Sequence, residues 1–213
     1  MIIAIDGPAA SGKGTLAKRL AGHYRLPHLD TGLLYRAVGL EVLERGVRFD
    51  DVPTITALAR ELDMANLDPE ALKSGPVGEA ASKVAAIAPV RAELLQLQQG
   101  FARQPGGAVL DGRDIGTVIA PEATVKIFVT ANPEARAERR FKELFERGEA
   151  TSLAEVLADI RRRDERDQGR ASAPLVVAQD AVILDNSDLD KEQSWQRALD
   201  IVETRLRGLC DDR

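Results

Sequence analysis

The chain opens with Ile2-Ile3-Ala4-Ile5-Asp6 and continues directly into Gly7-Pro8-Ala9-Ala10-Ser11-Gly12-Lys13-Gly14-Thr15. The first run is short and apolar and ends at a glycine–proline pair, so it predicts a buried strand followed by a turn. The second run has the spacing of a phosphate-binding loop, in which glycines let backbone N–H groups converge on phosphate oxygens. The helix predicted to follow would add the positive potential of its N-terminus, with Lys13 bridging terminal phosphates. The start of the chain therefore predicts a strand, a loop and a helix around bound phosphate.

The same glycines allow two other interpretations. A plain glycine-rich turn between a strand and a helix would bind nothing. Alternatively, Gly12, Gly14 and Ala17 fit a loose dinucleotide fingerprint, with Asp30 at a suitable distance downstream. The dinucleotide interpretation leaves Lys13 unexplained and begins too far beyond the end of the strand, so we favour the phosphate-binding loop.

Short apolar runs alternate with helical periods along the rest of the chain. Further strands are predicted at 108–111, 125–129 and 181–185. Helices are predicted at 14–23, 31–45, 54–62, 79–87, 90–103, 133–147, from Ser152 into the charged run at 161–170, and at 190–207. The polar segment 63–78, which carries a Gly-Pro pair, is expected to be a loop. Strands alternating with helices predict the α/β class, with a parallel sheet as the core and helices on both faces.

Three of the predicted strands end in an aspartate, namely Asp6, Asp111 and Asp185. Ligands of parallel α/β sheets bind at the carboxyl ends of the strands. Together the three carboxylates predict a polar rim around an active site at that edge of the sheet.

Composition excludes several classes of protein. With 213 residues, 44% of them hydrophobic, the chain is expected to form one globular domain, and a monomer is the default expectation. A net charge of −5 gives no basic field for a nucleic acid polymer. The single cysteine, Cys210, cannot form an internal disulfide, and His23 and His28 lack metal-ligand spacing and are expected at the surface or at the edge of a loop. No apolar run reaches the ~20 residues of a membrane span and no signal peptide is evident, so we expect a cytoplasmic protein without a membrane partner.

Arginine outnumbers lysine by 22 to 7, which favours bidentate phosphate recognition. A GTPase would need Asp-x-x-Gly and Asn/Thr-Lys-x-Asp elements, which the sequence lacks, and a motor would usually be longer. A kinase for a small acceptor fits better, because phosphoryl transfer depends on positioning and charge neutralisation. Interleaved acidic residues account for about half of the arginines between 136 and 170 as a solvated helix, and the others suggest a lid over phosphates. The full set of arginines between 136 and 170 is Arg136, Arg139, Arg140, Arg147, Arg161, Arg162, Arg163, Arg166 and Arg170.

Four segments together resemble the bacterial cytidylate kinases, nucleoside monophosphate kinases with a P-loop. The segments are the 7–15 loop with its Gly-Lys-Gly-Thr form, Asp30–Arg36, Asp111–Thr117, and Arg163–Arg170 followed by Ala173-Pro174-Leu175. Their order and spacing agree with the family over essentially the whole chain. The Asp-Gly-Arg-Asp-x-Gly-Thr element at 111–117 is the most specific, because adenylate kinases carry Asp-Gly-Phe-Pro-Arg there.

The resemblance implies an adenylate-kinase-like P-loop NTPase fold in a single domain over 1–213. Its core would comprise 1–30, 104–135 and 171–213, with an acceptor-binding region at about 31–103 and a lid at about 136–170. It also implies transfer of the γ-phosphoryl group of ATP to CMP or dCMP, giving CDP or dCDP and ADP, in pyrimidine nucleotide metabolism.

Residue roles follow from the same resemblance. ATP would be bound by Gly7, Pro8, Ala9, Ala10, Ser11, Gly12, Lys13, Gly14 and Thr15, and the catalytic residues would be Lys13, Arg113, Arg166 and Arg170. Mg²⁺ would be held by Thr15 directly and by Asp111 through water. CMP would be bound by Thr31, Arg36, Ser82, Arg91, Arg113, Asp114, Arg163, Asp167 and Arg170.

Within the CMP set, Arg36, Arg113 and Arg170 would hold the phosphate, and Arg163 and Asp167 the ribose. Cytosine offers an N4 amino donor, which suits the carboxylate of Asp114. Its N3 and O2 acceptors suit Arg91 and Ser82.

One departure from the family concerns the acceptor-binding region. Longer bacterial members carry a small extra β-sheet there, whereas 63–78 is too short and too poor in β-branched residues to form one. The alternatives of another class are a P-loop kinase for a non-nucleotide acceptor, such as shikimate or dephospho-coenzyme A, and a non-catalytic nucleotide-binding module.

Overall fold

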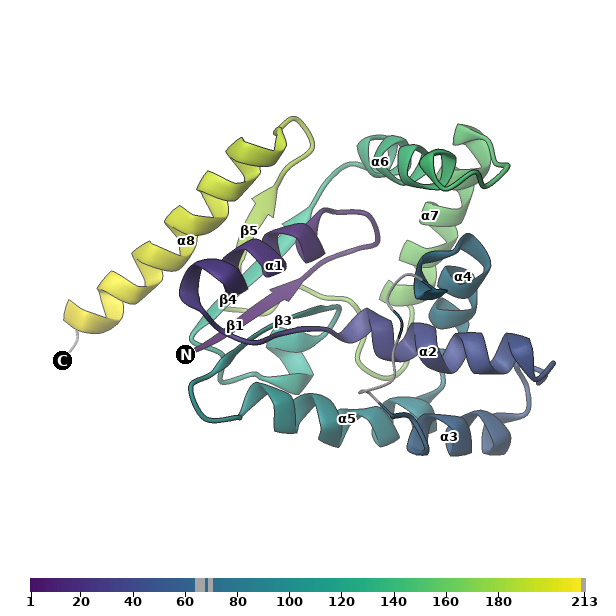
Figure 1. Ribbon diagram of the computed structural model, residues 1–213. Coiled ribbons are helices and arrows are strands. Elements are labelled where there is room, and N and C mark those ends of the chain that lie inside the picture. The colour runs from purple at the N-terminus through teal and green to yellow at the C-terminus, as the bar shows by residue number, and fades with distance from the viewer. Residues whose placement is uncertain (64–67, 69–70, 212–213) are drawn as a thin grey trace.

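The computed structural model describes residues 1–63, 68 and 71–211. Its five strands form one sheet in the order β2-β3-β1-β4-β5, and every neighbouring pair runs parallel (Figure 1). The strands are β1 (Ile2–Asp6), β2 (His28–Asp30), β3 (Ala108–Gly112), β4 (Val125–Thr130) and β5 (Val182–Asp185). The predicted α/β class with a parallel sheet is confirmed.

Eight α-helices and two short turns connect these strands within the described residues. The helices are α1 (Lys13–Tyr24), α2 (Thr31–Glu44), α3 (Val52–Arg60), α4 (Gly75–Val84), α5 (Ala88–Ala102), α6 (Pro133–Glu146), α7 (Leu153–Gln168) and α8 (Lys191–Asp211). A 3-10 turn spans Ala71–Lys73 and a π-helical turn spans Ile115–Ile119. Figure 1 shows α6 and α7 packed together beyond the ends of the strands, above α2 and α4.

Alternation along β1 explains why helices cover both faces of the sheet. Ile3 and Ile5 belong to a buried cluster with Leu20 of α1 and Val202 of α8. Ala4 points to the other face, in a cluster with residues of α5 and the π-helical turn. Side chains of successive strand residues point to opposite faces, so a short run that is apolar throughout is buried on both.

The structure adds a strand that the sequence did not predict. β2 has only three residues, and it pairs with β3 through His28 opposite Val109 and Asp30 opposite Asp111. Three residues are too few to produce a periodic pattern, so no strand was predicted between the first two helices.

The predicted loop at 63–78 is wrong in its second half. Residues 71–73 form the 3-10 turn, and α4 begins at Gly75. Its Ser74 cap accepts a hydrogen bond from the Val77 N–H, and Pro76 lies in the first turn, where a missing N–H costs nothing. No strand occurs in the part of this segment that is described, while 64–67 and 69–70 lie outside the described residues.

The close approach of β4 to the phosphate loop requires glycine at position 7. A Cβ atom there would lie 2.0 Å from the carbonyl oxygen of Val129. Two further residues of the loop have positive φ, Ala10 at 57° and Gly12 at 85°. The loop therefore leaves β1 against the neighbouring strand and turns sharply twice before α1 begins.

Asp6, at the end of β1, is buried and fixes the turn that follows β3. Its carboxylate accepts hydrogen bonds from the backbone N–H groups of Ile115 and Gly116, each 2.8 Å long. Burial raises the pKa of Asp6 to about 6, although these two bonds oppose the shift. Asp6 thus holds the segment that carries Arg113 and Asp114 against the central strand.

We expect Asp6→Ala to lower the free energy of unfolding by roughly 2–4 kcal/mol, because two buried N–H groups would lose their acceptor. Urea unfolding followed by circular dichroism measures the effect. Asp50→Ala is the matched control, since Asp50 is exposed and pairs with Arg48 at the surface, where a loss of at most ~1 kcal/mol is expected. Equal losses in the two variants would contradict the anchoring role.

Candidate active site

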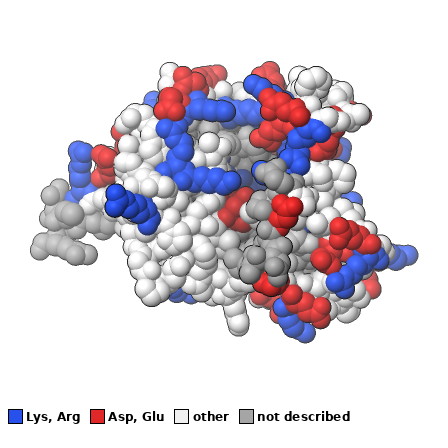
Figure 2. Space-filling view, viewed as in Figure 1, with Lys and Arg blue, Asp and Glu red and all other residues white. Residues whose placement is uncertain are grey.

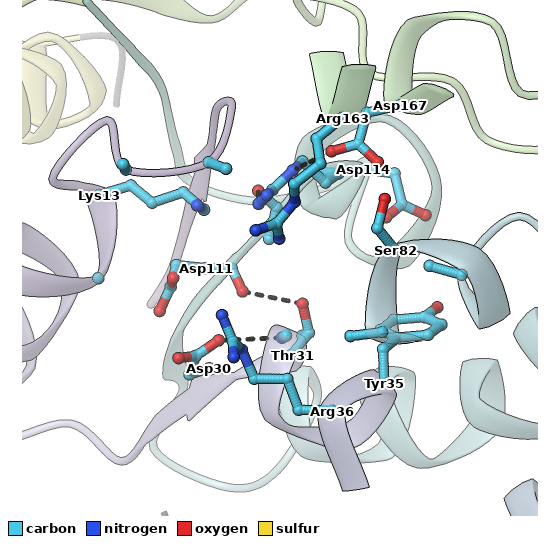
Figure 3. Close-up of a pocket in the computed structure, with 18 of the residues that line it drawn as sticks. Lys13, Asp30, Thr31, Tyr35, Arg36, Ser82, Asp111, Asp114, Arg163 and Asp167 are labelled. Carbon is cyan, nitrogen blue, oxygen red and sulfur yellow. Dashed lines mark hydrogen bonds and ion pairs between the residues drawn. The ribbon is translucent and has the colours of Figure 1, made fainter. Parts of the chain in front are cut away.

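A cavity of about 280 Å³ lies where the carboxyl ends of the central strands meet α1, α2, α4 and α7. Figure 2 shows a hollow with basic side chains around it on this face of the molecule. Its walls include the phosphate loop at one end and Ser82, Arg91 and Asp114 at the other. Side chains from both ends are shown in Figure 3.

Lys13 supplies a partly buried cation at the phosphate-loop end. Its ammonium group donates to the carbonyl oxygen of Pro8 at 3.2 Å. Burial, and then the neighbouring Arg113, lower the pKa of Lys13 to about 7. A phosphate anion beside this ammonium group would oppose both effects, so the environment favours anion binding.

Arg36 and Arg163 reach into the same space from opposite sides (Figure 3). Burial and then Arg140 lower the pKa of Arg36 to about 10, and burial and then Arg113 do the same for Arg163. The Nε atom of Arg163 is buried and has no hydrogen-bond partner in the described part of the chain. These partly buried cations repel one another, and an anion with several acceptor oxygens would satisfy them.

Asp167 of α7 compensates part of this charge. Its carboxylate lies 2.8 Å from Nε of Arg113 and 3.1 Å from Nη2 of Arg170. Burial opposes its ionisation, but the two guanidinium groups hold the pKa of Asp167 below its usual value. One carboxylate thus orients two arginines toward the cavity.

The far end of the cavity is a buried polar edge. Arg91 and Asp114 form an ion pair there, and the Arg91 guanidinium lies 5.5 Å from the centre of the Tyr35 ring. The Ser82 hydroxyl oxygen accepts a 2.6 Å hydrogen bond from Arg166. This edge presents a carboxylate, a guanidinium and a hydroxyl group, which are donors and acceptors suited to a heterocyclic base.

Arg166, predicted to be catalytic, does not line the cavity. Besides its bond to Ser82, it pairs with Glu79 of α4 at 2.9 Å. The predicted CMP-binding residues, a set that does not include Arg166, all line the cavity, and of the nine loop residues Ala9, Ala10, Gly12, Lys13, Gly14 and Thr15 do so. The structure thus brings together side chains from α2, α4, α5, α7 and the segment after β3.

Oxygen atoms cluster beside the first turn of α1. Thr15 and Asp111 line the cavity, and Asp111 Oδ2 lies 3.5 Å from the position that a Cβ atom on Gly14 would take. Burial, and then Asp111, raise the pKa of neighbouring Asp30. Among the described residues, no three or more His, Cys, Asp or Glu side chains are grouped so that they could hold a metal by themselves. Hard oxygen donors in small number suit a Mg²⁺ ion that takes most of its ligands from phosphates and water.

His28 lies at the edge of a loop, one of the two predicted positions, but its ring is turned inward rather than toward solvent. Its Nε2 atom lies 2.7 Å from Asp111 Oδ1, and only 15% of the side chain is exposed. His28 lies on the unpredicted strand β2, which places it directly beside β3. His23 is exposed, as predicted, and contacts Trp195.

The predicted rim of three aspartates is correct only for Asp111. Asp6 is turned beneath the segment after β3, and Asp185 is an exposed residue whose carboxylate accepts hydrogen bonds from Ser187. Strand ends share an edge, but each local turn decides where its side chain points.

The arginines of 136–170 divide into distinct groups. Arg140, Arg163 and Arg170 line the cavity. Several others form pairs on α6 and α7 that include Arg161 with Glu134 and Arg162 with Asp159. The sequence indicated Arg140 only as one of nine arginines in the suggested lid, and did not assign Asp30, Tyr35 or Glu143 to the site. Asp30 and Tyr35 carried a signal, since both lie in the Asp30–Arg36 motif, whereas Glu143 carried none.

No helix in the described ranges is both long enough and apolar enough to cross a membrane.

Comparisons with known proteins identify the family of the chain. The family described as cytidylate kinase matches residues 3–204. A cytidylate kinase of Xanthobacter autotrophicus is 65% identical over 98% of this chain and 100% of its own, and one of Azorhizobium caulinodans is 64% identical over the same shares. A crystal structure of an uncharacterized protein from Eubacterium ventriosum shares the fold at a TM-score of 0.54, with 17% identity over 96% of this chain and 98% of that one. The chain therefore belongs to the cytidylate kinase family.

Proposed function

We propose that the protein transfers the γ-phosphoryl group of ATP to CMP or dCMP. The observation that carries the proposal is one cavity with two unlike ends: partly buried cations around a phosphate loop, and a buried Ser82–Arg91–Asp114 edge suited to a base. A phosphate placed near Lys13 and a pyrimidine placed near Asp114 would lie in the same cavity. This is the arrangement that direct transfer between two nucleotides requires.

The phosphate loop, residues 7–15, is proposed to bind the phosphates of ATP through its N–H groups, with Lys13 on the terminal phosphates. Arg36, Arg113 and Arg170 hold the acceptor phosphate. Arg163 and Asp167 bind the ribose, and Thr31, whose hydroxyl donates to the Asp111 carbonyl, supports the acceptor side.

Transfer forms a bond from an acceptor phosphate oxygen to the γ-phosphorus and breaks the bond to the β-phosphate oxygen, so ADP leaves. Lys13, Arg113 and Arg170 stabilise the negative charge that spreads over the transferring group. Arg166 can join them only after leaving Glu79 and Ser82, to which it is bound in the structure.

Mg²⁺ is the proposed cofactor, with Thr15 as a ligand and Asp111 acting through water. The His28 ring, hydrogen-bonded to Asp111, would orient that carboxylate. When bound, the cation would neutralise phosphate charge.

The regional assignment is part of the proposal. We assign 31–103 to acceptor binding, 136–170 to a lid, and 1–30, 104–135 and 171–213 to the core of a single domain. We also propose that the protein is a monomer of the cytoplasm that uses neither a nucleic acid polymer nor a membrane. Light scattering in solution tests the oligomeric state.

The proposed function is tested by coupled measurement of ADP release with a panel of acceptors: CMP, dCMP, UMP, AMP, shikimate and dephospho-coenzyme A. CMP and dCMP should give the highest kcat/KM. Turnover only with a non-nucleotide acceptor, or none with any, would refute it.

Lys13→Ala should abolish turnover while the protein stays folded, because the ammonium group that stabilises phosphate charge is lost. Turnover is measured with CMP, and folding by circular dichroism. A folded variant that retains more than about a tenth of wild-type kcat would contradict the role of Lys13.

Arg170→Ala should lower kcat as well as raise KM for CMP, since a phosphate clamp acts in the transition state. Steady-state kinetics at saturating ATP separates the two constants. An unchanged kcat would make Arg170 a ground-state binder only.

Asp114→Asn should collapse the preference for CMP over UMP. UMP carries an O4 acceptor where CMP carries the N4 donor, so a carboxylate favours CMP and an amide can donate to UMP. The ratio of kcat/KM values for the two should fall by about 10- to 100-fold, given ~1–3 kcal/mol for a matched polar contact.

Arg36→Lys is the matched control for this selectivity, because Arg36 is assigned to the phosphate, which CMP and UMP share. The kcat/KM values for CMP and UMP should fall by the same factor, so their ratio should not change. If Asp114→Asn keeps the wild-type ratio, Asp114 does not read the base.

A further inference from the structure

Two carbonyl groups of the phosphate loop are held by side chains from elsewhere in the chain. Nη1 of Arg136 donates to the carbonyl oxygen of Ala9 at 3.2 Å. Nδ2 of Asn186 donates to the carbonyl oxygen of Ser11 at 2.8 Å. Both donors are 97% buried, Arg136 on α6 and Asn186 just after β5.

The residue between the two held carbonyls is Ala10, whose φ of 57° is unusual for a residue with a side chain. The left-handed conformation costs an alanine on the order of 1 kcal/mol, so the surroundings have to stabilise it. Hydrogen bonds to the carbonyls on either side of Ala10 supply that stabilisation.

Holding these carbonyls also determines where the loop directs its N–H groups. In a planar trans peptide, the C=O of one residue and the N–H of the next point in opposite directions. The carbonyls of Ala9 and Ser11 point to Arg136 and Asn186, so the following N–H groups point the other way. Those N–H groups belong to Ala10 and Gly12, which line the cavity.

Arg136 is itself fixed on two other sides. Its Nε donates to the carbonyl oxygen of Ala131, and its Nη atoms donate to the two carboxylate oxygens of Asp164 on α7, at 3.0 and 2.5 Å. Because the guanidinium group is planar and these bonds fix its plane, the direction of its hydrogen bond to Ala9 is also fixed.

The orientation of the Asn186 amide is determined equally well. Its Oδ1 accepts a 2.9 Å hydrogen bond from Arg139, so its Nδ2 is left to face Ser11. The backbone of Asn186 is tied by its N–H to Thr130 and by its carbonyl oxygen to a second donor of Arg139.

We infer that Arg136 and Asn186 are positioning residues that hold the phosphate loop in the conformation that binds ATP. Arg136 and Arg139 therefore act behind the loop, through its backbone and through Asn186. The inference rests on the proposed function, because it takes ATP as the ligand of the loop.

Calorimetric titration of the full-length protein with ATP, and separately with CMP, tests the inference. Arg136→Lys and Asn186→Leu should each weaken ATP binding by about 3- to 10-fold, the equivalent of one hydrogen bond. CMP binding should not change, because Arg136 and Asn186 hydrogen-bond to the phosphate loop but to none of the residues assigned to CMP. A variant that lost its fold would instead bind both ATP and CMP more weakly.

Arg161→Lys is the matched control for Arg136→Lys. Arg161 also joins α7 to α6, through Glu134, but it is exposed, and its hydrogen bond and ion pair to Glu134 lie away from the loop. ATP binding by this variant should equal that of the wild type.

Ala10→Gly provides the second test, because glycine adopts a positive φ without strain. Combined with Arg136→Lys, it should restore much of the lost ATP affinity, measured against Ala10→Gly alone. Unchanged ATP affinity in both Arg136→Lys and Asn186→Leu, equal losses for ATP and CMP, or no recovery with Ala10→Gly would each overturn the inference. A wild-type protein that does not bind ATP would instead refute the proposed function itself.

Discussion

The site depends on one electrostatic constraint, the partial burial of several cations around a small cavity. Burial lowers the pKa values of Lys13, Arg36 and Arg163. Burial also opposes the charge of Arg113, but Asp167 outweighs it and the pKa of Arg113 is raised. Removing a charge from water is costly unless an opposite charge replaces the water. Asp167 supplies one such charge, and polyphosphate would supply the rest. The cavity thus favours an anionic ligand, which would stabilise the charged form of these side chains.

The sheet provides the rigidity that such a site needs. β1 is covered on both faces, and its two flanking strands bring Asp111 and the Val129 carbonyl to either side of the phosphate loop. The loop can therefore adopt a strained path because its two ends are fixed by buried strand and helix. Asp6 extends the same support to the segment after β3, so both ends of the cavity are attached to the central strand.

Arginines of helix α6 both hold the phosphate loop from behind and line the cavity. Arg136 and Arg139 are bound to backbone carbonyls and to Asn186, whereas Arg140, one residue further, faces the cavity. The helical repeat alone directs these neighbours to different surroundings. Contacts of Arg140 with the Lys73 carbonyl and of Glu149 with the Gly75 N–H connect this part of the chain to the region before α4.

The sequence alone was sufficient for the parallel α/β class, the phosphate loop and the family, because these depend on local patterns and on the order of motifs. It also identified most residues that line the cavity, since they lie in contiguous motifs. It did not reveal β2, which is too short for a pattern, or the start of α4, whose Gly-Pro pair is equally typical of a loop. Only the tertiary structure could show His28 bonded to Asp111, 83 residues away, or Asn186 holding Ser11 from a distance of 175 residues. Such contacts arise because parallel strands place distant segments at one edge of the sheet, and no local periodicity records them.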